Sequence, residues 1–251
     1  MRFEELFVNA KPVIAMVHLN GDSAESVLER AKQEIDIYLR NGVDAVLAEN
    51  YFGSVEDIER TLDYLHEHLP DAIYGVNVLG NYGHAFELAE RYGAKFIQID
   101  SVCGHLPPLM DDYYDEELIA LRRNSDAVLL GGVRFKYQRV RSGRSVAEDV
   151  RLGMERCDAI VVTGEGTGLA TPLEKVKAFR SIVGDYPLIV GAGVTLNSLY
   201  EDMKYCDGFI VGSWFKENHE AEGEVCEDYV REFMAERNRV RSRMAEGKEG
   251  H

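Results

Sequence analysis

The sequence has few cysteines, no long apolar run and a deficit of positive charge. Its four cysteines show no C-x-x-C spacing, so neither a zinc ribbon nor a thioredoxin motif is indicated. No apolar stretch approaches the roughly 18 residues that span a bilayer. The N-terminal segment carries acids where a secretory signal carries a basic and then an apolar run. We therefore expect a cytoplasmic protein with reduced thiols and no membrane insertion.

The charge balance excludes two classes of partner. The 251 residues contain 28 Lys and Arg against 44 Asp and Glu, which gives a net charge of −16. Nucleic acids and anionic membranes are bound by extended positive surfaces, so neither is expected as the main partner. With 45% hydrophobic residues, a chain of this length can bury a sizeable core.

Short apolar runs rich in Val, Ile, Leu and Ala recur along the chain and alternate with segments of helical periodicity. Strand and helix alternating eight times in about 250 residues is typical of a (β/α)₈, or TIM, barrel. Continuously apolar strands agree, because parallel strands are buried on both faces. The eight predicted strands are 12–19, 44–50, 72–79, 95–102, 127–135, 159–164, 187–193 and 208–214.

The repeat predicts one TIM-barrel domain over residues 1–251, with the barrel at about 11–235. A C-terminal helix packs on the barrel, and a frayed, charged tail covers about 240–251. A Rossmann fold fits less well, because the Gly-rich turns come late and lack the G-x-G-x-x-G form after the first strand. Aspartates open five strands, and we interpret them as structural residues at the bottom of the barrel: Asp44, Asp71, Asp126, Asp158 and Asp207.

In such a barrel the residues that end each strand face one shared pocket. Those positions hold carboxylates, a histidine, a lysine and amides, more ionisable groups than a purely structural rim needs. The predicted catalytic residues are His18, Glu49, Asn77, Asp100, Lys136, Thr163 and Glu165.

Small residues follow the seventh and eighth strands, as GAGVT and VGS. Glycine lets backbone N–H groups approach an anion closely, and barrels of this type often bind a substrate phosphate there. The alternative is that these glycines only make tight turns. We predict that the phosphate is bound by Gly191, Gly193, Thr195, Gly212 and Ser213.

A basic segment, RFKYQRVRSGR at 134–144, has five positive residues and no acid. It follows the fifth strand, on the predicted active face. One interpretation is a lid that attracts an anionic substrate, with Lys136 placing an ammonium against developing negative charge. The other is a solvated loop whose arginines pair with neighbouring acids.

The carboxylates allow more than one chemistry. Glu49 and Asp100 are candidates for general base and acid, or for sharing a Mg²⁺ ion with substrate oxygens. His18 is a candidate proton relay, and His105 is a further candidate for the pocket. The sequence contains no H-x-x-H spacing, so a catalytic zinc site is not expected. No cofactor is predicted, and Mg²⁺ is the alternative.

The strand-end motifs together resemble the BtpA/SgcQ family. KPVIAMVHL, GVDAVLAEN, YGVNVLGN, DAIVVTGEGTG, IVGAGVTLNSL and CDGFIVGSWFK carry the resemblance in order, from about residue 11 to 235. The resemblance implies a TIM barrel similar to the ribulose-phosphate-binding group. One branch of the family is linked to photosystem I assembly and another to a sugar-utilisation operon.

By position, the resemblance adds Asn50, Gly164, Asn197 and Lys216 to the candidates above. Three loops depart from the family pattern: NGDS after the first strand, NYGH after the third and IDSVCGH at the fourth. These loops would shape specificity, so the substrate cannot be carried over from the family.

The sequence thus predicts an enzyme acting on a phosphorylated sugar or similar small phosphate ester, by proton transfer next to a carbonyl or by aldol-type cleavage. The alternative is a BtpA-like assembly or biogenesis factor with a non-catalytic pocket. A third possibility is Mg²⁺-dependent phosphate-ester hydrolysis. The expected partner is a small anionic phosphorylated ligand, and a homo-oligomer is expected. Tyr113 and Tyr114 either cover the pocket or form a subunit contact.

Overall fold

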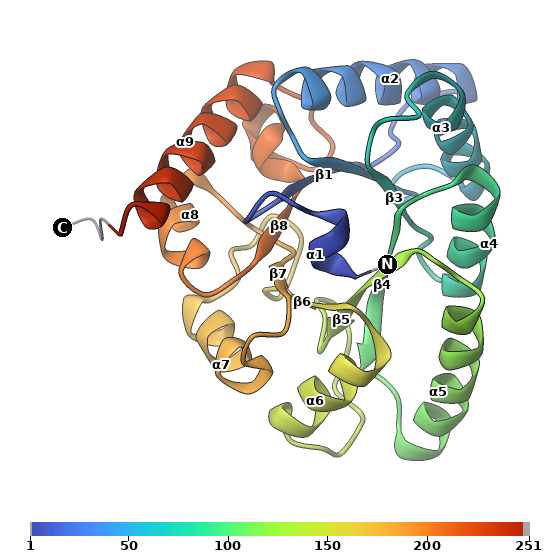
Figure 1. Cartoon of the computed structure of the whole chain (residues 1–251). Coiled ribbons are helices and arrows are strands. Elements are labelled where there is room, and N and C mark those ends of the chain that lie inside the picture. The colour runs from blue at the N-terminus through green and yellow to red at the C-terminus, as the bar shows by residue number, and fades with distance from the viewer. Residues whose placement is uncertain (1, 248–251) are drawn as a thin grey trace.

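Eight parallel strands close into a barrel in the computed structural model, which describes residues 2–247. The strands follow one another around the ring, and β1 pairs with β8 to complete it. Helices surround the strands (Figure 1). The strands are β1 (Val13–Val17), β2 (Ala45–Glu49), β3 (Tyr74–Asn77), β4 (Phe96–Cys103), β5 (Val128–Val133), β6 (Ala159–Val162), β7 (Leu188–Val190) and β8 (Gly208–Val211).

The helices alternate with the strands, so the predicted (β/α)₈ order is confirmed. One short helix precedes the first strand, and α9 follows the last. The helices are α1 (Phe3–Leu6), α2 (Ala24–Arg40), α3 (Val55–His68), α4 (Tyr82–Tyr92), α5 (Pro108–Arg123), α6 (Val146–Arg156), α7 (Leu173–Val183), α8 (Leu196–Met203) and α9 (Glu227–Ala245), with short 3₁₀ helices η1 (Ser213–Phe215) and η2 (Glu217–His219). The predicted charged tail is helical as far as Ala245, and residues 248–251 lie outside the described part.

Two apolar layers form the core, because successive strand residues point to opposite faces. On β1, Val13 and Ala15 pack outward against the helices, whereas Ile14 and Met16 point into the barrel. Large side chains inside the barrel fill the space beside small residues, as Phe96 does beside Gly75. A Cβ atom on Gly75 would lie 2.3 Å from the ring of Phe96.

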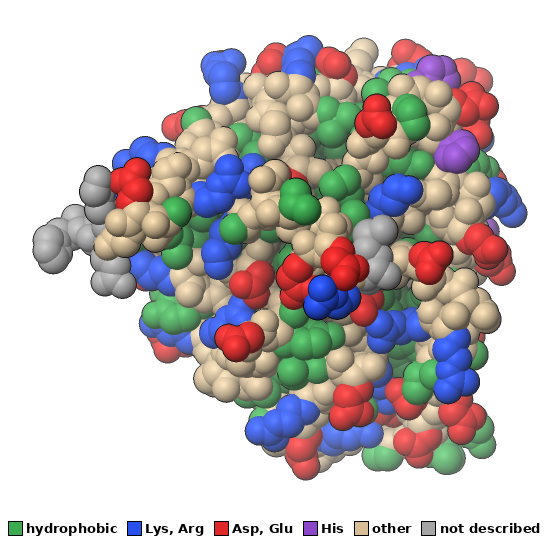
Figure 2. Space-filling model, viewed as in Figure 1, with side chains coloured by type: hydrophobic (Ala, Val, Ile, Leu, Met, Phe, Trp, Pro, Cys, Tyr) green, Lys and Arg blue, Asp and Glu red, His purple; other side chains and the backbone are tan. Residues whose placement is uncertain are grey.

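Helix α1 closes the bottom of the barrel, the end where the strands begin (Figure 1). Phe3, Leu6 and Phe7 belong to the inner apolar cluster, and the rings of Phe7 and Phe96 are 5.9 Å apart. Figure 2 shows this bottom face, where acidic and basic side chains are interspersed. The open mouth therefore lies at the opposite end, as expected for this fold.

Aspartates tie the bottom of the barrel together, as predicted for three of the five. Asp44, Asp158 and Asp207 each accept the N–H at the start of the preceding strand, from Val13 (2.9 Å), Leu129 (2.8 Å) and Leu188 (2.9 Å). Each also pairs with an arginine on an outer helix, respectively Arg237, Arg122 and Arg180. Asp71 and Asp126 are exposed and have no such side-chain bond within residues 2–247.

Candidate functional site

The barrel interior changes from apolar to polar where the strands end. Met16 points inward on β1 and Leu47 on β2. Two residues further on, the same alternation turns His18 and Glu49 toward the axis, where both line one chamber. Both side chains are buried, with 3% and 5% of their surface exposed.

Glu49, Asn77 and Asp100 form one hydrogen-bonded group across β2, β3 and β4. Asn77 Nδ2 donates to Glu49 Oε2 at 2.6 Å and to Asp100 Oδ1 at 3.0 Å. Gln98 Nε2 donates to the same Asp100 oxygen at 3.3 Å. The pairing of β4 with β5 shifts register between Ile99 and Cys103, so Asp100 lies in an irregular stretch of its strand. Such bulges re-aim side chains near functional sites.

Glu49 is placed to exchange a proton near neutral pH. Burial and the neighbouring charge of Asp100 raise its pKa to about 8, against the opposing effects of Lys136 and the Asn77 hydrogen bond. A catalytic acid or base works best when its pKa lies near the working pH. The three predicted residues Glu49, Asn77 and Asp100 thus form a unit suited to proton transfer.

His18 is uncharged at neutral pH. Its pKa falls to about 3 because it is buried and because Lys216 and Lys136 are nearby. Lys216 is itself fully buried, with Nζ 3.2 Å from Glu34 Oε1. His18 can therefore act as a neutral hydrogen-bonding group, whereas the predicted relay role would require it to take up a proton.

Lys136 reaches the same chamber from the end of β5. Its backbone N–H donates to Thr163 Oγ1 at 2.9 Å, and its Nζ donates to Thr167 Oγ1 at 3.0 Å. Tyr51 also donates to Thr167 Oγ1, at 3.2 Å. The ammonium is thereby held at the rim between the carboxylates and the glycine-rich turns.

The turns after β7 and β8 form a glycine corner, defined by Gly191, Gly193, Gly212 and Ser213, all of which line the chamber. Gly193 has a φ of +61°, and a Cβ there would lie 2.1 Å from the carbonyl oxygen of Leu169. Only glycine fits this position. The backbone N–H groups of Gly193, Gly212 and Ser213 have no hydrogen-bond partner within residues 2–247.

The chamber is small, and a larger cavity lies on the other side of the Glu49–Asn77 hydrogen bond. Its volume is about 30 Å³, room for about two or three water-sized groups, which is the scale of one oxyanion. A neighbouring cavity of about 290 Å³ is lined by Asn77 and Asp100, together with Tyr82, His105 and Tyr114. Asn77, in the wall of this cavity, is hydrogen-bonded to Glu49 in the wall of the chamber.

Asn77 and Asp100 line the neighbouring cavity, and three further predicted site residues line neither space. Thr163 is buried, and its hydroxyl holds the Lys136 backbone, so it positions the lysine. Glu165 is exposed on the β6–α7 loop. Thr195 caps α8, with its hydroxyl accepting from Ser198 N at 3.2 Å.

The family resemblance also pointed to residues with supporting roles. Asn50 Oδ1 accepts the Leu79 N–H at 2.8 Å and so joins the loops after β2 and β3. Asn197 is exposed on α8. Gly164 packs under its own loop, where a Cβ would lie 2.8 Å from the Ala170 carbonyl oxygen.

Two polar side chains of the chamber, Gln98 and Thr167, were not among the predicted site residues. Gln98 lies two positions before Asp100, so strand alternation alone would have placed it on the same face. Thr167 belongs to the GEGTG motif from which Glu165 was chosen, and no sequence pattern distinguishes the inward residue of that loop.

The basic segment divides between the two interpretations offered for it. Arg134 Nε lies 2.8 Å from Asp149, and Arg144 NH1 lies 2.7 Å from Asp111, and both aspartates are fully buried. These two arginines are therefore structural anchors. Arg139 and Arg141, in contrast, are exposed and have no ion pair within residues 2–247.

The two tyrosines of α5 have different environments. Tyr114 is buried, donates its hydroxyl to the Ser101 carbonyl at 3.0 Å and packs edge-on against His105. Tyr113 is 68% exposed, beside Leu109 and Met110 on the same turn of the helix. Tyr114 thus forms a pocket wall, and the homo-oligomer stays a prediction.

The Mg²⁺ alternative also stays a prediction. Glu49 and Asp100 share the Asn77 amide, but residues 2–247 contain no cluster of three His, Cys, Asp or Glu side chains arranged to hold a metal. Mg²⁺ is often bound by one or two carboxylates plus substrate phosphates. The same carboxylates would therefore hold such an ion, if one entered with a phosphate ester.

The closed parallel ring and the polar mouth with its glycine corner define a (β/α)₈ barrel with a polar pocket where its strands end. Within that class, the chain belongs to the BtpA family, whose model matches residues 9–239. No helix within residues 2–247 has the length and apolarity needed to cross a membrane.

Relatives span nearly the whole chain. An uncharacterised protein of Thermococcus kodakarensis is 32% identical, covering 89% of this chain and 94% of the relative. The photosystem I biogenesis protein BtpA of Synechocystis is 28% identical, covering 84% and 83%. Among solved structures, phosphoribosyl anthranilate isomerase from Thermus thermophilus shares the fold, with a TM-score of 0.62, 16% identity and coverage of 91% and 99%.

Proposed function

We propose that the protein is an enzyme acting on a phosphorylated sugar or related small phosphate ester, by proton transfer next to a carbonyl group. The arrangement that carries this proposal is Glu49, buried beside Asp100 and facing the same chamber as the glycine corner. A phosphate would accept hydrogen bonds from the N–H groups of Gly193, Gly212 and Ser213.

The chemistry follows from the charges around the chamber. Glu49 would remove a proton from the carbon next to the carbonyl, and its pKa near 8 lets it hold and later return that proton. The enolate formed would be stabilised by the Lys136 ammonium and by hydrogen bonding to neutral His18. In an aldol-type cleavage, Lys136 would instead lose a proton, attack the carbonyl carbon and release water to form a protonated imine. A carboxylate would then take the proton of the β-hydroxyl group, the C–C bond would break to release an aldehyde, and the electron pair would pass to the imine as an enamine.

A simple exchange experiment tests the proposal without knowledge of the full reaction. Aldose and ketose phosphates are incubated with the protein in D₂O, and NMR follows replacement of the C–H next to the carbonyl. We expect exchange for a phosphorylated sugar but not for its dephosphorylated form. Glu49→Gln should slow it at least about a hundredfold, whereas Glu116→Gln, on the exposed surface of α5, should not change it.

The phosphate end has its own matched pair of variants. Gly193→Ala places a methyl group against Leu169 and should abolish binding of the phosphorylated sugar in calorimetry. Gly42→Ala also has a positive φ but meets no atom within 4 Å, so it should bind as the wild type does. The enzyme proposal would be overturned if no sugar phosphate showed either exchange or binding.

That outcome would favour the second candidate, an assembly or biogenesis factor with a non-catalytic pocket. One observation supports this candidate: the Synechocystis relative is named as a photosystem I biogenesis protein. Release of inorganic phosphate from the sugar phosphate, lost on adding EDTA and recovered on adding Mg²⁺, would instead favour the Mg²⁺-dependent hydrolysis.

A further inference from the structure

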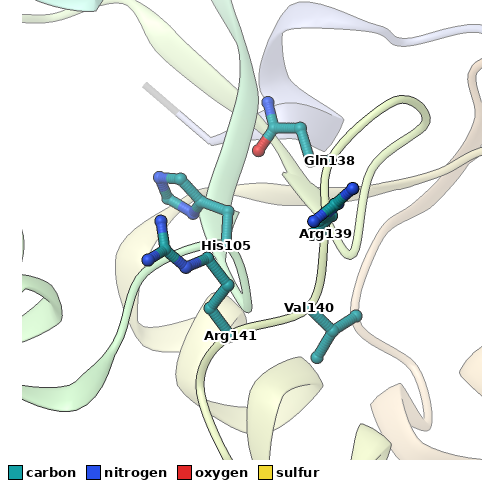
Figure 3. A pocket seen from close by; sticks show the side chains of 5 residues that line it. All are labelled: His105, Gln138, Arg139, Val140 and Arg141. Carbon is teal, nitrogen blue, oxygen red and sulfur yellow. The ribbon is translucent and has the colours of Figure 1, made fainter.

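An open groove lies beside the barrel mouth, between the β4–α5 connection and the basic segment 134–144. Its volume is about 630 Å³, and its lining residues are His105, Gln138, Arg139, Val140 and Arg141 (Figure 3). In Figure 3 the Arg141 guanidinium lies next to the His105 imidazole, and the Gln138 amide extends into the same space. The groove therefore combines two cations with two neutral polar groups.

The two arginines of the groove are held without being neutralised. Arg134 and Arg144, on either side of them in the chain, are fixed by buried aspartates. The backbone N–H of Arg141 also donates to the Gly104 carbonyl at 2.8 Å. Arg139 and Arg141 thus project from an anchored loop with no acidic partner within residues 2–247, in a chain whose net charge is −16. Guanidinium groups bind carboxylate and phosphate with paired hydrogen bonds.

Two buried polar atoms in the groove have no hydrogen-bond partner within residues 2–247: Nδ1 of His105 and Oε1 of Gln138. Buried polar groups in folded proteins are nearly always hydrogen-bonded, so an unpaired one indicates a missing partner. The imidazole can donate to an oxyanion, and the amide oxygen can accept from a hydroxyl group. A polyhydroxylated anion would satisfy both atoms.

The groove is continuous with the cavity beside the proposed active site. His105 and Gln138 also line the 290 Å³ cavity, whose other wall contains Asn77 and Asp100. The groove lies on the β4–β5 side of Glu49 and Asp100, whereas the glycine corner follows β7 and β8. In an eight-membered ring these two sides lie across the barrel axis from each other.

We propose that this groove is a second anion-binding site, so that the ligand is an extended molecule with an oxyanion at each end. One phosphate occupies the glycine corner, and a carboxylate or a second phosphate binds Arg139 and Arg141. This inference rests on the proposed function for its first end. It narrows the substrate class to sugar bisphosphates or phosphorylated sugar acids.

Calorimetry with four probes tests the inference: ribose 5-phosphate, fructose 1,6-bisphosphate, 6-phosphogluconate and gluconate. Wild-type protein should bind at least one two-ended probe ten times more tightly than ribose 5-phosphate. The double variant Arg139→Gln/Arg141→Gln should remove that advantage and leave ribose 5-phosphate unchanged. Arg123→Gln, an exposed arginine of α5, is the matched control and should change none of the affinities.

The outcomes separate the two ends of the ligand. The preferred two-ended probe shows whether the groove binds carboxylate or phosphate. Equal affinity for one-ended and two-ended probes, or an advantage that survives the double variant, overturns the second site while the phosphate corner stands. Binding of gluconate that is lost in the double variant, with no binding of ribose 5-phosphate, supports the groove but contradicts the glycine corner. Failure of all four probes overturns both.

Discussion

The bottom and the mouth of this barrel use the same kinds of charged residue in opposite ways. At the bottom, Asp44 accepts the Val13 N–H and pairs with Arg237 at 3.0 Å. At the mouth, the neutral Asn77 amide is the one hydrogen-bond donor to Glu49 within residues 2–247. Asp158 and Asp207 likewise each pair with an arginine, whereas Arg139 and Arg141 have no acidic partner within residues 2–247.

The difference shows where the molecule is stabilised and where it is prepared for a ligand. Paired charges and satisfied strand ends hold the barrel closed at the bottom. The mouth contains N–H donors without acceptors, a protonated carboxyl group and buried polar atoms without partners. A bound anion would accept hydrogen bonds from these donors. Substitutions at the two ends should therefore change stability in opposite directions.

The largest loss of stability is expected for Asp44→Ala. The side chains of Arg237 and Asp44 are only 3% and 10% exposed, so the substitution leaves a buried guanidinium without its counter-charge. The free energy of unfolding should fall by about 3–5 kcal/mol, measured by urea denaturation. Asp71→Ala removes an exposed strand-opening aspartate and should change it by less than about 0.5 kcal/mol. Equal effects would contradict the structural role of Asp44.

Glu49→Gln should have the opposite sign, with a gain that grows with pH. Because the pKa of Glu49 is raised from 4.5 to about 8, the folded state keeps a proton that the unfolded chain has released. Wild-type stability therefore falls as the pH rises through this range, by up to about 1.4 kcal/mol per unit.

The window above pH 6.5 isolates this effect, because His18 titrates between about 3 and 6.5. Between pH 6.5 and 8 the Gln variant should gain about 2 kcal/mol relative to the wild type. Glu116→Gln serves as the control. Parallel stability profiles for wild type and Glu49→Gln would show that Glu49 is already ionised at pH 6.5.

A smaller effect is expected for Asp158→Ala. This residue accepts the Leu129 N–H and pairs with Arg122, but both side chains of the ion pair are about one-quarter exposed. Solvent screens the pair, so the loss should be about 1 kcal/mol. Asp126→Ala, which precedes the neighbouring strand and is exposed, should change the denaturation midpoint little. If Asp158→Ala lost as much stability as Asp44→Ala, solvent exposure of the ion pair would not determine how much each pair contributes.

The sequence predicted the barrel well because its strands are apolar on both faces and recur eight times. It also placed Glu49, Asn77 and Asp100 together, since strand ends converge at one mouth. It did not predict which arginines would be free, because the acids that fix Arg134 and Arg144 lie on α5 and α6. The inward turn of Thr167 depends on how its loop packs over the glycine corner. Such contacts are set by tertiary structure.

The glycine corner also lies along the seam where the ring closes. Strands β1 and β8 come from opposite ends of the chain and pair through Val13–Phe209, Ile14–Ile210 and Ala15–Val211. A Cβ on Gly212 would lie 3.0 Å from His18, so the two strand ends are in close contact. An anion bound here would hold together the junction between the two ends of the chain. Occupancy would then slow the opening of the ring and couple ligand supply to the lifetime of the folded protein.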